Sequence, residues 1–130
     1  MKSDFRDLDV WKKGKEIRIS VSKIVKTFPV EEKYRLSDQM VRASRSITAN
    51  IAEGYGRYNY QDIIRFCRQS RGSIYELIDH FEVAFESGYL ERDQYSRLND
   101  DLDSILALLN GYIKFLSEKK KSLKSKPLNN

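Results

Sequence analysis

Four stretches of this chain repeat an apolar spacing built from steps of four and three residues, and this repeat restricts its fold more than any other feature. In a helix with 3.6 residues per turn, such a spacing keeps the apolar side chains on one stripe that a neighbouring helix can cover. The chain has only two prolines, and no run alternates apolar and polar residues for long enough to indicate a strand. The stripes are Val10, Gly14, Ile17, Val21, Ile24 and Phe28; Leu36, Met40, Ala43, Ile47, Ile51 and Gly54; Ile63, Cys67, Ser70, Ile74, Leu77, Phe81 and Ala84; and Tyr95, Leu98, Leu102, Ile105, Leu109, Tyr112 and Leu116. The pattern predicts an all-α protein.

Residues that start and stop helices set the expected bounds. Pro29 disfavours helical geometry at Phe28 and closes the first helix. Ser37 is expected to cap the second helix, and Asn59, with Asp62 three residues later, to cap the third. The predicted helices cover about 7–27, 37–54, 60–87 and 92–120. Four helices of similar length with short connections are typical of an antiparallel up-down-up-down four-helix bundle.

Length and composition favour one domain. A chain of 130 residues with 40% hydrophobic content can bury one substantial core. We predict the bundle over residues 1–121 and a basic, disordered tail over 122–130. The first residues lack an apolar run of signal-peptide length, and no run of 18 apolar residues occurs. The single Cys67 excludes an internal disulfide and fits a reducing compartment, so we expect a cytoplasmic protein with no membrane partner.

Charge is distributed unevenly along the chain. Residues 1–72 carry 16 basic and 9 acidic side chains, residues 73–113 carry 2 and 9, and residues 114–130 carry 6 and 1. Two interpretations remain open. The basic part binds a polyanion, or it binds the acidic part of another subunit.

The sequence offers little for catalysis. His80 is the only histidine, so it has no second histidine with which to share a metal or a proton relay, and we expect its side chain to be solvated. Cys67 lies on an apolar stripe and is expected to be a small core residue rather than a nucleophile. The glycines form neither a phosphate loop nor a dinucleotide-binding motif. We therefore predict no enzyme, no catalytic residue, no metal site and no cofactor.

Arginine is concentrated in the second and third predicted helices. Six arginines and no lysine lie between residues 42 and 71, and guanidinium groups suit phosphate contacts. Tyr55, Tyr58 and Tyr60 surround the connection and are placed to stack on unpaired bases. The alternative is that the arginines pair with carboxylates of the third and fourth helices while the tyrosines hold the loop to the bundle. The candidate nucleic-acid-binding residues are Arg42, Arg45, Arg57, Arg65, Arg68 and Arg71.

The segment 39–57 combines a core stripe with a polar row beside it. Burying such a row is unfavourable unless its groups bond one another or a partner. On the third helix, Gly72 projects away from the apolar stripe at a cost of about 1 kcal/mol relative to alanine. A glycine there permits close approach by another backbone, as do Ala49 and Ala52 on the second helix; a tolerated surface glycine is the alternative. The polar row is Gln39, Arg42, Ser46, Asn50 and Glu53.

Three segments resemble a known family. They are FRDLDVWKKG, FPVEEKYRLSDQMVRASRSITANIAEGYGR and FCRQSRGSIYELI. They are similar to the bacterial four-helix-bundle proteins encoded in intervening sequences of large-subunit rRNA genes, over about residues 4–118. The chain is also similar in architecture to the accessory bundle proteins of diversity-generating retroelements, which act with a reverse transcriptase and its RNA.

The resemblance implies a cyclic homo-oligomer, expected to be a pentamer, with basic surfaces for nucleic acid. The sequence departs from the family pattern at Tyr34-Arg35, where Tyr-Gly is common, and at Cys67, where an aliphatic residue is common. Arg35 adds positive charge just before the second helix. The resemblance implies an architectural role for Arg42 and for the assembly motif of Ser46, Asn50, Glu53, Gly54, Gly72, Ser73 and Glu76.

The leading hypothesis is a non-enzymatic, oligomeric basic bundle that binds RNA or DNA with low sequence specificity through the six arginines and the lysine tail. The alternative is a protein–protein interaction scaffold whose charged faces pair between subunits.

Overall fold

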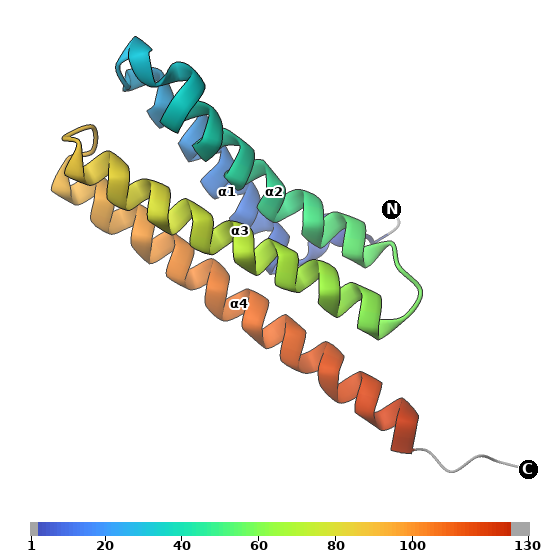
Figure 1. Cartoon of the computed structure of the whole chain (residues 1–130). Coiled ribbons are helices and arrows are strands. Elements are labelled where there is room, and N and C mark those ends of the chain that lie inside the picture. The colour runs from blue at the N-terminus through green and yellow to red at the C-terminus, as the bar shows by residue number, and fades with distance from the viewer. Residues whose placement is uncertain (1–2, 126–130) are drawn as a thin grey trace, which may run out of the picture.

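The computed structural model describes residues 3–125 and is an all-α four-helix bundle with no strand among those residues. Its helices are α1 (Asp9–Ile24), α2 (Asp38–Tyr55), α3 (Tyr60–Glu86) and α4 (Arg92–Ser125). Figure 1 shows them lying side by side along one long axis. Each helix packs mainly against two others, in the cyclic order α1, α2, α3, α4 and back to α1. The α1/α2 edge and the α3/α4 edge therefore lie on opposite faces of the bundle.

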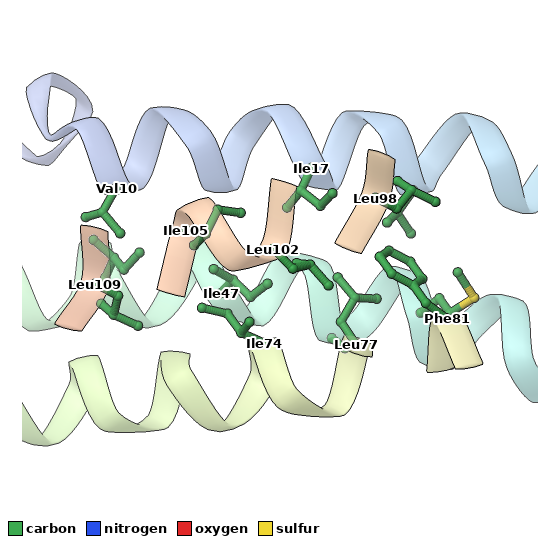
Figure 2. Packing of buried hydrophobic residues seen from close by; sticks show 14 of the residues in the cluster. Val10, Ile17, Ile47, Ile74, Leu77, Phe81, Leu98, Leu102, Ile105 and Leu109 are labelled. Carbon is green, nitrogen blue, oxygen red and sulfur yellow. The ribbon is translucent and has the colours of Figure 1, made fainter. Parts of the chain in front are cut away.

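The core is formed by the predicted stripes. Of the stripe residues, Ile17, Ile47, Ile74 and Leu102 are at most 1% exposed. Figure 2 shows such side chains from all four helices pointing into one interior. Ile64 and Ile113 are also buried, although they lie outside the predicted stripes, because a helix with 3.6 residues per turn drifts relative to a strict 3.5-residue repeat.

Of the two predicted helix caps, one is confirmed and the other is wrong. Asn59 caps α3, because its Oδ1 accepts a hydrogen bond of 2.8 Å from the Asp62 N–H. The predicted cap at Ser37 is wrong: Ser37 has helical dihedrals and its side chain makes no capping bond. A π-helical turn over Lys33–Ser37 leads directly into α2, so Ser37 does not stand at a free helix start.

The bounds of α1, α2 and α3 differ from the predicted ones by three residues or fewer. A 3-10 turn over Val25–Thr27 extends α1 towards Pro29. Gly88 follows α3 with a φ of 79°, a left-handed conformation that glycine adopts without strain.

Helix α4 is longer than predicted. It continues to Ser125, because no glycine or proline follows Gly111 until Pro127. The prediction of a disordered tail over 122–130 is therefore wrong for residues 122–125, and residues 126–130 lie outside the described part. In Figure 1, the end of α4 continues past the beginning of α3. No helix within residues 3–125 has the length and apolar character needed to cross a membrane.

Candidate nucleic-acid interface

The polar row of α2 is bonded partly to α3 and partly within its own segment of the same chain. Ser46 Oγ accepts hydrogen bonds from Ser73 Oγ at 2.9 Å and from Asn50 Nδ2 at 3.0 Å. Asn50 Nδ2 also donates to the Ser46 carbonyl at 2.9 Å. Below this row, the buried Ser70 hydroxyl donates to the Ile47 carbonyl at 2.8 Å. These bonds satisfy polar groups at the α2–α3 contact, so part of the segment's polarity is explained within one protomer.

A second network links Arg42 to α3. Its Nη2 donates to Glu76 Oε2 at 2.7 Å and to Gln39 Oε1 at 2.6 Å. His80 Nε2 lies 3.0 Å from the same Glu76 oxygen. The His80 side chain is only 17% exposed, so the expectation of a solvated histidine is wrong. The spacing of four residues between Glu76 and His80, which places both on one side of a helix, was the sequence signal for this contact.

Gly54 permits a close approach between α2 and α3. A Cβ atom at this position would lie 2.8 Å from Phe66 Cβ and 3.3 Å from the Ile63 carbonyl oxygen. Its neighbour Glu53 pairs with Arg57 at 3.3 Å on the surface, where such a pair contributes little stability. Gly54 therefore has a packing role within the protomer.

Four of the six candidate arginines interact with partners in the same chain. Arg42 bonds Glu76, and Arg71 Nη1 donates to Asn110 Oδ1 on α4 at 3.0 Å. Arg57 and Arg65 pair with Glu53 and Asp62 on their own surface turns. Their guanidinium carbons also lie 4.8 and 4.7 Å from the centroid of the Phe66 ring. Only Arg45 and Arg68 make no guanidinium hydrogen bond or ion pair within residues 3–125.

Arg45 lies in a surface groove between α1 and α2, which we call the α1/α2 groove. Two adjoining hollows of about 420 and 300 Å³ form it, and both include Arg18 and Arg45. Arg18 is held by a 2.9 Å hydrogen bond from its Nη1 to Thr48 Oγ1. Together the hollows are lined by Phe5, Trp11, Arg18, Ile19, Ser22, Lys23, Lys26, Arg45, Thr48, Ala49 and Ala52, and none of these described residues is acidic.

Helical spacing explains why α1 presents cations to this groove. Arg18 and Ser22 are four residues apart and therefore share one side of α1, and Lys26 follows in the 3-10 turn that extends this helix. Asp9 and Glu16 lie on the opposite side of the same helical projection. The basic side of α1 thus meets Arg45 of α2, a combination that the predicted set of six arginines did not include.

Arg68 lies in a different groove of about 260 Å³, between the start of α3 and the end of α4. We call it the α3/α4 groove. Its lining residues are Gln61, Ile64, Arg68, Ser117, Lys120, Lys121 and Lys124. The two unpaired arginines therefore belong to separate sites.

The tyrosines near the α2–α3 connection differ in exposure. Tyr58 is fully exposed. Tyr60 is half-buried against the core, and the Tyr55 ring lies edge-on to Phe5 at a centroid distance of 6.4 Å. Of the three, Tyr58 best fits the prediction of a side chain open to a stacking base, whereas Tyr55 and Tyr60 help to hold the loop.

Groups that could act in catalysis are buried or dispersed. Burial raises the pKa of the Cys67 thiol to about 11, so the thiol stays protonated near neutral pH and behaves as a core residue. Burial likewise raises the pKa of Tyr112 to about 12. No group of three or more His, Cys, Asp or Glu side chains in the described chain could hold a metal ion.

Comparison with known proteins decides the family. Residues 6–111 match the family described as 23S rRNA-intervening sequence protein. The chain belongs to this family. The 23S rRNA-intervening sequence match covers α1, α2, α3 and most of α4, and it includes the two α2–α3 polar networks. Lys120, Lys121 and Lys124 of the α3/α4 groove lie beyond the matched residues.

A solved structure supports the same assignment. It is a protein of unknown function from the S23 ribosomal protein family of Bacteroides thetaiotaomicron. It is 28% identical to this chain, with a TM-score of 0.75, over 81% of this chain and 95% of that one. No curated protein matches the sequence.

Proposed function

We propose that this 23S rRNA-intervening sequence family member binds nucleic acid, RNA or DNA, with low sequence specificity through the α1/α2 groove. One observation carries the proposal. The unpaired guanidinium of Arg45 shares a groove with Arg18, Lys23 and Lys26, and no carboxylate lines that groove.

Like charges gathered without a counter-charge favour binding of a polyanion. Lysine and arginine side chains that neutralise phosphates release the counterions condensed on the nucleic acid, and this release supplies most of the sequence-independent affinity. The groove offers cations rather than a set of donors and acceptors matched to base edges. Of its two aromatic residues, Phe5 lies edge-on to Trp11 at a centroid distance of 5.4 Å, and Trp11 already has Lys15 and Arg18 within 6 Å of its ring centroid. Phosphate contact without base reading is therefore the mode that fits.

Of the six arginines predicted to bind nucleic acid, only Arg45 lines the α1/α2 groove. Arg42, Arg57, Arg65 and Arg71 instead bond to or pair with other side chains of the same protomer. A direct role of those four in nucleic-acid binding stays a prediction.

A pair of double variants on one helix tests the groove. Lys23→Ala/Lys26→Ala is expected to weaken binding of a 20-bp DNA duplex on the order of tenfold per lysine at about 50 mM salt, because each lysine that contacts a phosphate contributes a counterion-release term. The matched control is Lys12→Ala/Lys13→Ala, which removes the same charge from exposed positions of α1 outside the groove. Fluorescence anisotropy gives both affinities. Equal losses in the two variants would mean that only net charge matters and that the groove is not a site.

We further propose that the chain assembles as a homo-oligomer, with five copies expected from the family resemblance. Gly72, Tyr75 and Val83 lie on one face of α3; Tyr75 and Val83 are 58% and 39% exposed, and a Cβ on Gly72 would meet no atom within 4 Å. Such a face suits contact with another copy. Light scattering should then give about five times the chain mass of 15.3 kDa, and a monomer mass at micromolar concentration would contradict it. A separate protein partner and a cytoplasmic location stay predictions.

A further inference from the structure

The α3/α4 groove contains a second set of positive charges. Lys120, Lys121 and Lys124 recur on one side of α4 and face Arg68 and Gln61 of α3. Lys120 Nζ donates a hydrogen bond to the neutral Gln61 side-chain oxygen, so its charge has no counter-charge there. Four cations therefore line a groove of about 260 Å³.

These charges remain uncompensated within the described chain. Arg68, Lys121 and Lys124 make no side-chain hydrogen bond or ion pair among residues 3–125. Glu118 is the only acidic residue from position 114 to position 125, and it does not line the groove. A cluster of this kind attracts phosphate groups by the same counterion release that we invoke for the α1/α2 groove.

The two grooves lie on opposite faces of the bundle. The cyclic order of the helices places the α1/α2 edge across the core from the α3/α4 edge. Figure 1 shows α3 between α2 and α4 in this view, with the end of α4 projecting beyond α3. Each helix with its side chains is about 10–12 Å wide, so the grooves are separated by roughly two helix diameters. A straight duplex lying in one groove does not reach the other, because DNA is stiff over about 150 bp.

We propose that the α3/α4 groove is a second phosphate-binding site and that one protomer thereby bridges two nucleic-acid segments. The inference rests on the proposed function and adds an activity to it, the joining of two strands or duplexes. The lysines that supply this activity belong to the last turns of α4, beyond the part of the chain that matches the family.

A bridging assay tests the inference. One 20-bp duplex is fixed to a surface, protein is added, and capture of a second, labelled 20-bp duplex is measured; a 20-nucleotide single-stranded RNA pair forms the second arm. The wild-type protein is expected to capture the second molecule. Lys121→Ala/Lys124→Ala should still bind the fixed duplex through the α1/α2 groove but reduce capture at least tenfold at about 50 mM salt.

The matched control is Lys114→Ala/Lys119→Ala, which removes two exposed lysines of the same helix outside the groove and should retain capture. Capture by Lys121→Ala/Lys124→Ala at the wild-type level would overturn the inference and leave the proposed function standing, since bridging would then arise from α1/α2 grooves of assembled copies. Loss of all binding in that variant would also overturn it, because the α3/α4 groove would be the sole site. Failure of the wild-type protein to bind the fixed duplex at all would instead refute the proposed function.

Discussion

Replacement of Phe81 by alanine is expected to lower the free energy of unfolding by about 3–5 kcal/mol. Phe81 is fully buried on α3, and Figure 2 shows its ring in the bundle interior near Leu77 and Leu98. The substitution removes a whole ring, and the cavity left between rigid helices closes only in part. Because small domains have a total stability of about 5–15 kcal/mol, the loss is a large fraction of the whole.

Urea unfolding followed by circular dichroism measures this effect. Leu123→Ala near the end of α4 is the control, since Leu123 is 59% exposed and its truncation should change stability by no more than about 0.5 kcal/mol. If Phe81→Ala unfolded at the same urea concentration as Leu123→Ala, the packing of the core as described would be wrong.

Two glycine-to-alanine changes are expected to act in opposite directions. Gly54→Ala should lower the free energy of unfolding by about 1–3 kcal/mol, because the new Cβ lies 2.8 Å from Phe66 Cβ and overpacks the α2–α3 contact. Gly111→Ala should raise it by about 0.5–1 kcal/mol, because its Cβ meets no atom within 4 Å and alanine reduces the entropy lost on helix formation.

Gly111 lies in the interior of α4 and Gly54 in the last turn of α2, so alanine suits the helix at both positions, and a loss of stability at Gly54 alone reports the contact with α3. Thermal unfolding of the two variants beside the wild-type protein is sufficient. A Gly54→Ala protein more stable than the wild type would show that α2 and α3 do not approach as closely as the structure has them.

The fold could be predicted because its information is local. The spacing of four and three residues fixes which side of each helix is buried, while the Asn59 side chain caps the start of α3 and Gly88 follows its end with a left-handed backbone. The prediction of a cap at Ser37 is wrong because a serine caps a helix only where the helix begins, and here a π-helical turn leads into α2. The end of α4 was predicted too early, because a polar, lysine-rich sequence suits both a solvated helix and a disordered tail.

The candidate site was harder to predict because it depends on contacts between distant residues. Arg42 and Arg45 are three residues apart on α2, yet Arg42 bonds Glu76 of α3, while Arg45 shares a groove with Lys23 of α1 and with Lys26 of the turn after it. The two side chains differ because they project from α2 in different directions, Arg42 towards α3 and Arg45 towards α1. Counting arginines along the chain could therefore not tell paired side chains from free ones.

The salt dependence of binding tests the central claim most directly. For the wild-type protein and a 20-bp duplex, the four cations of the α1/α2 groove predict that the logarithm of the association constant falls with the logarithm of salt concentration with a slope of about −3 to −4. Anisotropy titrations between about 50 and 200 mM salt give this slope. A steep linear fall supports nucleic-acid binding through phosphates, whereas absent binding, or an affinity that does not change with salt, contradicts it.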